Sequence, residues 1–258
     1  MPAPINPFKK SLKAGETVFG CWLGLADTFS AELMGGAGFD WLLIDGEHAP
    51  NDLRSILAQL QVLSASPSHA IVRVPIGETY LIKQVLDAGA QTILVPMVES
   101  AAQARKLVRD VTYPPHGDRG VGYALTRAAR FSRTTDYGTT ADAETCLLVQ
   151  VENRKGLAAL DEILDVQGVD GVFIGPADLA ADMGHMGNAQ HPDVQGAIMD
   201  ALRRIRAAGK APGILSTRDE MTRDALDAGA QFVAVGADVL LLNSAALALA
   251  QKWKKPTR

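Results

Sequence analysis

Apolar and polar positions follow two alternating patterns along this chain. Short apolar or β-branched runs, bounded by turn-forming residues, are separated by longer segments in which apolar residues recur every three or four positions. Short buried runs indicate strands and the longer period indicates helices, so their alternation is typical of βα units around a parallel sheet. Eight strands are predicted, at residues 18–23, 39–45, 69–74, 91–96, 147–151, 169–175, 210–215 and 231–236.

An internal repeat indicates how these units are arranged. The stretch LDAGAQTILVP (86–96) returns as LDAGAQFVAVG (226–236), and GGAGFDWLLID (35–45) is a looser copy. Each copy reads as a helix that ends at a glycine, followed by a buried strand. Eight such strands in one chain favour an α/β fold, a (β/α)8 TIM barrel forming a single domain over residues 1–258. An open sheet would need a GxGxxG turn, whereas the first strand continues into WLGLADTF (22–29).

Two connections are longer than the repeat requires. Residues 111–145, after the fourth strand, carry Pro, Gly and four arginines, and residues 178–193 follow the sixth strand. Long ordered loops on barrels are often functional. Arg119 stands in the flexible sequence GDRGVG and is a candidate substrate ligand, whereas the arginines at 127, 130 and 133 are better explained as loop surface or subunit contacts.

Charge and composition exclude several classes of partner. The 258 residues have a formal charge of −4, which leaves no basic excess for nucleic-acid phosphates. The N-terminus lacks an apolar signal sequence, and the apolar stretch 239–250 is too short to span a bilayer. Cys21 and Cys146 lie in strand-like contexts without metal-type spacing. A soluble cytoplasmic protein without nucleic-acid or membrane partners is therefore expected.

Ionisable residues gather where the predicted strands end. Asp45 closes the second strand, with Glu47 and His48 just beyond it, and Arg73 lies near the end of the third. Glu152 follows the fifth strand and Asp178 the sixth. Active sites of such barrels lie at the C-terminal ends of the strands, so these side chains are predicted to meet there.

Glu152 and Asp178 together predict a metal site. Asp178 alone could be a helix N-cap, but Glu is a weak capping residue. Neighbouring parallel strands lie about 4.8 Å apart, and two carboxylates brought together repel unless a proton or a cation separates them. Oxygen ligands without a His or Cys cluster favour Mg²⁺ or Mn²⁺, or Co²⁺, with positions left open for a substrate.

The remaining candidates each have a structural alternative. His48 suits general acid/base catalysis, but a loop histidine bonded to a neighbouring acid is common. Arg73 could bind an anionic substrate or only balance the acidic mouth. Trp22 and Leu215 could form an apolar pocket wall or simply pack. Lys155 and Lys210 do not lie at the end of a strand, which argues against a Schiff-base enzyme.

Several linked motifs resemble one known family. WLLIDGEHAP, IVRVP, LDAGAQTILVPMVES, YPPHGDRGVG, QVENRKG, GVFIGPADL and FVAVGAD occur in the order and spacing of the HpcH/HpaI aldolases, which are metal-dependent pyruvate aldolases. The resemblance implies a class II aldolase, an aldehyde-lyase that reversibly cleaves a 4-hydroxy-2-oxoacid into pyruvate and an aldehyde without a Schiff base. It also implies a homo-oligomer, a hexamer.

The resemblance also implies roles for individual residues. Glu152 and Asp178 would bind the metal, Arg73 would stabilise the enolate oxygen, and His48 would move the proton of the aldol hydroxyl. The amides near Ala177 and Asp178 would hold the pyruvate carboxylate, with Gln150 close by. Asp45 and Glu47 would contact the metal indirectly, through other ligands or through water. Asp87 would reach the histidine of a neighbouring subunit, although its copy at Asp227 indicates that LDAGA also ends a helix.

Two alternatives remain at this point. Another metal-dependent lyase of the same superfamily, acting on a CoA thioester or resembling phosphoenolpyruvate mutase, is the main rival, although few basic residues outside 111–145 are available for CoA phosphates. A phosphate isomerase is disfavoured because Asp238 follows the last strand. A non-catalytic scaffold is the alternative from another class. The aldehyde is not identified by the sequence.

Overall fold

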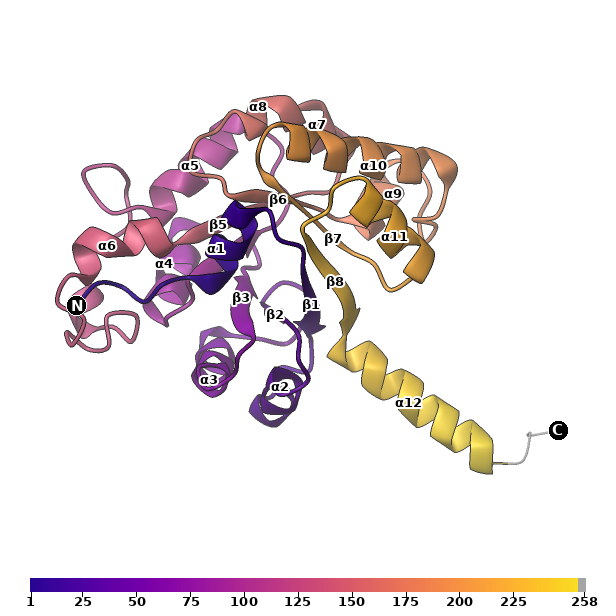
Figure 1. Cartoon of the computed structure of the whole chain (residues 1–258), viewed down its shortest axis with the longest axis horizontal. Helices are drawn as coiled ribbons and strands as arrows, with labels where there is room; N and C mark the ends of the chain where they lie inside the picture. The colour runs from indigo at the N-terminus through magenta and orange to yellow at the C-terminus, as the bar shows by residue number, and fades with distance from the viewer. Residues whose placement is uncertain (255–258) are drawn as a thin grey trace.

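The computed structural model, which describes residues 1–254, is a closed barrel of eight parallel strands (Figure 1). Each strand pairs with the next, and β8 pairs with β1. The TIM barrel expected from the sequence is confirmed, and each observed strand lies within two residues of its predicted bounds. The strands are β1 Val18–Leu23, β2 Trp41–Asp45, β3 His69–Arg73, β4 Thr92–Val95, β5 Cys146–Val151, β6 Gly171–Ile174, β7 Ala211–Leu215 and β8 Phe232–Ala237.

Aromatic side chains fill the barrel interior from its lower end, where the strands begin. Phe8 of α1 (Pro7–Ala14) contacts Trp41 at 6.1 Å and Phe232 at 5.9 Å between ring centroids. Two glycines make room for this layer: a Cβ on Gly20 would lie 2.1 Å from Trp41, and one on Gly213 would lie 2.2 Å from Phe232. The interior is therefore a packed core, as the architecture requires.

Most of the helices surround the barrel and bury the outward-facing strand residues. Their bounds are α1 Pro7–Ala14, α2 Thr28–Gly35, α3 Leu53–Leu63, α4 Thr79–Asp87, α5 Ala101–Val111, α6 Tyr137–Glu144, α7 Arg154–Ala158, α8 Leu160–Leu164, α9 Pro176–Asp182, α10 Pro192–Ala207, α11 Asp219–Asp227 and α12 Asp238–Trp253, with a 3-10 turn at Tyr123–Leu125. The LDAGA repeat ends α4 and α11. In both copies the glycine has a positive φ, 106° at Gly89 and 99° at Gly229, so the motif is a helix stop.

The long connection lies at the lower end of the barrel. Residues 112–145 leave α5 and return to the start of β5, and they include α6. They pack against the N-terminal segment, where the Ala3 amide donates to Thr140 Oγ1 at 2.8 Å and the Asn6 amide donates to Glu144 Oε2 at 2.7 Å. Residues 111–145 were predicted as a long connection directly after the fourth strand, but α5 separates this segment from β4, and the segment therefore lies at the end opposite the C-terminal strand ends.

The last helix, α12, does not pack back onto the barrel. Figure 1 shows it projecting beyond β8. Asp238 is its one buried residue within the described part of the chain. Its exposed apolar side chains are Val239, Leu240, Leu241, Leu242, Leu247, Leu249 and Trp253. So large an exposed apolar surface is rare on monomeric soluble proteins. Among residues 1–254, no helix is long and apolar enough to cross a membrane.

Candidate active site at the C-terminal ends of the strands

Asp45 and Arg73 form a hydrogen-bonded ion pair in the site. They end neighbouring strands and are register partners. The Arg73 guanidinium donates from Nε to Asp45 Oδ1 at 2.9 Å and from Nη2 to Oδ2 at 2.7 Å, while Nη1 lies 2.8 Å from Glu47 Oε2. Burial opposes ionisation of Asp45, but the hydrogen bonds and charge of Arg73 outweigh it, and the pKa of Asp45 is lowered. This bidentate pair fixes the guanidinium plane.

Glu152 is buried across from this pair, just after β5. The Met97 amide donates to its Oε1 at 2.9 Å, and the Gln150 side-chain amide donates to its Oε2. Burial raises the pKa of Glu152, and the nearby negative charge of Asp178 raises it further against these hydrogen bonds. Gly175 leaves the room for this carboxylate, because a Cβ there would lie 2.5 Å from Glu152 Oε2.

Asp178 stands in the first turn of α9 and is exposed at the mouth of the barrel. It makes no side-chain cap for α9, so the N-cap explanation does not account for it. Ala177 lies beside it on the same turn. The amides of a first helical turn have no acceptor within the helix, so they can donate hydrogen bonds to an anionic group.

The donor set fits a hard divalent cation. Among the described residues, Asp45 and Glu47 contact Arg73, and Glu152 lies close enough to feel the charges of Arg73 and Asp178. Four carboxylates thus accompany one guanidinium, so the site is anionic. The pKa of Glu47 is also raised, by burial first and then by the charge of Glu152 against that of Arg73. Carboxylate oxygens with open positions suit Mg²⁺ or Mn²⁺. Gln150 Oε1 is buried without a hydrogen-bond partner in the described structure and can accept a bond from a bound molecule.

His48 lies at the rim of the site. Its side chain is 68% exposed, and its Nε2 lies 3.9 Å from Glu47 Oε1. Its backbone amide donates a long, 3.4 Å hydrogen bond to Asp45 Oδ1. The imidazole is therefore free to contact a substrate from the solvent side of the buried carboxylates.

Trp22 and Leu215 are apolar residues near the C-terminal ends of β1 and β7. Trp22 is 7% exposed, packs on Phe173 with ring centroids 5.4 Å apart, and lies under the Arg73 guanidinium at 5.4 Å. Leu215 is half-buried against the same interior cluster. Trp22 therefore belongs to the core and contacts Arg73 of the site, whereas the observed contacts of Leu215 are with the core.

Asp87 and Arg119 are not brought to this site within one chain. Arg119 was expected on a flexible loop near the substrate, but it is 1% exposed at the lower end of the barrel. Its Nη2 donates to Asp87 Oδ1 at 3.1 Å, and its guanidinium lies 4.4 Å from the Tyr113 ring. Asp87 ends α4 on that same side. The glycine-rich sequence around Arg119 indicated flexibility, whereas burial and the ion pair hold it.

Two contributors were not predicted. Met97 takes a left-handed backbone conformation with φ 55° that turns its amide toward Glu152. A left-handed backbone conformation is strained for a non-glycine residue, so contacts from the surrounding structure must hold Met97 in it. The local sequence therefore carries no signal for it. Asp238 accepts hydrogen bonds from the Gly24 amide at 2.7 Å and the Leu25 amide at 3.2 Å, so it holds the loop after β1.

Comparison with known proteins agrees with this geometry. A model of the HpcH/HpaI aldolase/citrate lyase family matches residues 18–245. The chain belongs to this family. The resemblance seen in the sequence is thereby confirmed, and the enzyme is an aldolase, a carbon–carbon lyase.

Individual relatives cover almost the whole chain. A hydroxypyruvate/pyruvate aldolase of Roseobacter denitrificans is 60% identical over 99% of this chain and 100% of its own length. A 4-hydroxy-2-oxo-heptane-1,7-dioate aldolase of Klebsiella pneumoniae is 57% identical over 96% of this chain and 94% of its own. Among solved structures, a family member from Burkholderia cenocepacia has a TM-score of 0.92 and 40% identity, covering 96% of this chain and 100% of its own. These names favour the aldolase over the thioester-lyase and scaffold alternatives.

Proposed function

We propose that this aldolase is metal-dependent and reversibly cleaves a 4-hydroxy-2-oxoacid into pyruvate and an aldehyde. The observation that carries the proposal is Arg73, buried and held by Asp45 and Glu47 beside the crowded carboxylates Glu152 and Asp178. The carboxylates would repel an anionic 2-oxoacid unless a divalent cation is bound between them and the substrate. Glu152 and Asp178 would hold that cation, Mg²⁺, Mn²⁺ or Co²⁺.

The chain's own residues then act on the substrate. The cation, when bound, supplies a Lewis acid that polarises the 2-oxo group. The Arg73 N–H groups that remain free stabilise negative charge developing on the oxygen at C2. The amides of Ala177 and Asp178 orient the carboxylate, with the Gln150 amide beside them. His48 takes the proton of the 4-hydroxyl from the solvent side as the carbon–carbon bond breaks.

The names of the relatives extend the range of nucleophiles to be tested. One relative is named for hydroxypyruvate as well as pyruvate, and another for a heptanedioate substrate. Hydroxypyruvate differs from pyruvate by one hydroxyl at C3. We propose pyruvate as a donor of this chain and hydroxypyruvate as its competitor at the same site.

Exchange of the pyruvate methyl protons tests the proposal. EDTA-treated protein is incubated with pyruvate in D₂O, with and without Mg²⁺ or Mn²⁺, and the methyl signal is followed by NMR. Metal-dependent loss of the signal is expected in the wild type and in Arg54→Lys, an exposed control, but not in Glu152→Gln. Absence of exchange with every metal, or inhibition by submillimolar coenzyme A, would contradict the proposal and favour a thioester lyase.

We also propose that the enzyme is a homo-oligomer, a hexamer as the family resemblance implies, in which a second copy covers the apolar side chains of α12. Other exposed apolar residues lie on β1, α2 and β8: Phe19, Phe29, Leu33 and Val235. A polar patch would not need such a cover. Light scattering after gel filtration is expected to show an oligomer, and Leu241→Glu with Leu249→Glu is expected to dissociate it. A wild-type monomer would contradict the proposal.

A reducing cytoplasm is the proposed location. Cys21 and Cys146 are both free and buried. Burial, and to a smaller extent the negative charge of Asp238, raises the pKa of the Cys21 thiol to about 11. The thiol is therefore unreactive at neutral pH. Cell fractionation with a cytoplasmic marker tests the location, and recovery in a secreted or membrane fraction would contradict it.

A further inference from the structure

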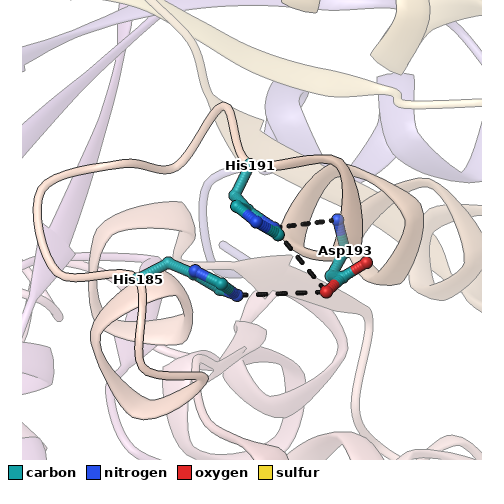
Figure 2. A group of neighbouring side chains, drawn as sticks. All are labelled: His185, His191 and Asp193. Atoms are coloured by element: carbon teal, nitrogen blue, oxygen red, sulfur yellow. Dashed lines mark hydrogen bonds and ion pairs between the residues drawn. The ribbon is translucent and has the colours of Figure 1, made fainter.

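A second cluster of potential ligands lies outside the aldolase site, in the connection between α9 and α10. His185, His191 and Asp193 each offer one ligand atom, and these atoms all lie within 4.8 Å of one another. Figure 2 shows the two imidazole rings stacked, with the Asp193 carboxylate at their edges. The ring centroids are 3.5 Å apart and the planes differ by 13°. Nitrogen donors are absent from the Glu152 and Asp178 pair, so the two clusters have different chemistry.

The carboxylate of Asp193 lies close to both rings without a hydrogen bond to either. Its Oδ2 is 4.0 Å from His185 Nε2 and 3.7 Å from His191 Nδ1, which is beyond hydrogen-bonding distance. Two ligand atoms about 2 Å from one tetrahedral ion are roughly 3.3 Å apart. To bind one ion, the two rings must turn out of their stack so that their nitrogen lone pairs converge, and His191 Nδ1 must release the Asp193 amide. All three side chains are at least partly exposed, which leaves room for this movement.

Backbone contacts already hold the connection in this shape. The His185 amide donates to Ala180 O at 2.7 Å, the Asn188 amide to His185 O at 2.9 Å, and the His191 amide to Asn188 O at 3.1 Å. Gly184 and Gly187 take the positive φ values, 86° and 73°, that the tight turns require. A ligand set whose backbone is fixed loses little conformational entropy when it binds an ion.

Capping of α10 explains only part of the cluster. His191 is the N-cap residue and its Nδ1 accepts the Asp193 amide at 3.3 Å, while Asp193 lies in the first turn, where a negative charge is favoured. His185 has no part in that cap. It comes from a different turn, yet its ring lies on His191 and its Nε2 is directed at Asp193 (Figure 2).

We propose that His185, His191 and Asp193 form a second metal site, which binds Zn²⁺ or another late first-row divalent ion. Two imidazoles and one carboxylate are borderline donors that select such ions over Mg²⁺. The remaining position belongs to water. The ion joins the turn after α9 to the start of α10, and α9 carries Asp178, so the site steadies the helix that contributes to the aldolase centre. The site does not depend on the proposed aldolase mechanism.

Zn²⁺ titration against a chelating indicator, in the Glu152→Gln background that weakens the carboxylate site, tests the proposal. About one Zn²⁺ per chain is expected in this background. His185→Ala is expected to weaken that binding at least roughly tenfold. His116→Ala, which removes an exposed histidine elsewhere, is the matched control and is expected to change nothing. Equal affinity in the His185→Ala and His116→Ala proteins would overturn the proposal.

Two further measurements separate binding from misfolding. Asp193→Asn preserves the shape of the side chain but removes its charge, and it is expected to weaken Zn²⁺ binding without changing the circular dichroism spectrum. Co²⁺ substituted at the site is expected to give the intense visible absorption of a tetrahedral ion, and this absorption should vanish in His185→Ala. Zn²⁺ is expected to raise the Tm of the Glu152→Gln protein but not of its His185→Ala derivative. If the protein binds Zn²⁺ at this site but has no aldolase activity, the proposed function is contradicted and the second metal site is supported.

Discussion

Arg73 and Asp45 face each other across neighbouring strands, and two hydrogen bonds of 2.9 and 2.7 Å hold the guanidinium flat against the carboxylate. Glu47 restrains the guanidinium from a second direction at 2.8 Å. The orientation of Arg73 is therefore set before a substrate arrives, which lowers the reorganisation needed during the reaction.

Arg73→Lys is expected to lower kcat/KM by roughly 100-fold, because an ammonium cannot make the bidentate contact with Asp45 or keep a fixed plane toward the substrate. Steady-state kinetics at saturating Mg²⁺ measures the effect. Arg54→Lys, at an exposed position, is the control. Unchanged kinetics in Arg73→Lys would show that only the charge of Arg73 is used.

Gly175→Ala is expected to lower activity more than tenfold by displacing Glu152, since the added Cβ would lie 2.5 Å from Glu152 Oε2. Metal affinity, measured by calorimetry, should fall with the activity. Gly196→Ala is the matched control, because a Cβ there meets nothing within 4 Å. It lies within α10 and is expected to stabilise the fold by about 0.5–1 kcal/mol. Full metal affinity in Gly175→Ala would refute the crowding argument.

Acid is expected to destabilise the lower end of the barrel through His69. Burial lowers the pKa of His69 from 6.5 to about 4, and its Nε2 lies 2.8 Å from Thr92 Oγ1. Between pH 6.5 and 4 the unfolded chain binds a proton at His69 and the folded chain does not. The free energy of unfolding is therefore highest above pH 6.5 and falls as the pH drops toward 4. The loss should be about 2–3 kcal/mol. Urea unfolding across this range measures it, and His69→Gln should flatten the slope; an unchanged slope in that variant would assign the loss to other groups.

Subunit mixing tests whether Asp87 serves a neighbouring active site. Asp87→Ala and Arg73→Ala homo-oligomers are each expected to be inactive. Mixed oligomers should regain part of the activity, because some sites then combine an intact Arg73 with an intact Asp87 from the next subunit. Activity assayed after co-refolding is the readout. Arg119→Ala, which leaves Asp87 without its 3.1 Å partner, is expected to lower stability by about 3–5 kcal/mol. If no mixture recovers activity, Asp87 does not serve a neighbouring active site, and its role is limited to the ion pair with Arg119.

The architecture was predictable because it depends on repeated local signals. Buried apolar runs and the LDAGA helix stops at Gly89 and Gly229 define βα units, and the parallel strands then place Asp45, Arg73 and Glu152 at one end. The position of Arg119 was not predictable in this way. Its segment connects α5 to β5, at the lower end of the barrel, instead of connecting β4 to α5 at the upper end. The two cases can be told apart only if α5 is recognised between β4 and this segment. The strained Met97 depends on tertiary contacts that leave no trace in the local sequence.

The aromatic filling of the barrel has a kinetic consequence. Phe8, Trp41, Phe232 and Phe173 pack together across the barrel interior, so the substrate and both products of the proposed reaction would share the opening at the C-terminal strand ends. Pyruvate, held against the buried carboxylates, would lie beneath the aldehyde fragment at the His48 rim. The two products should therefore depart in a fixed sequence, aldehyde before pyruvate, and condensation should require pyruvate to bind first.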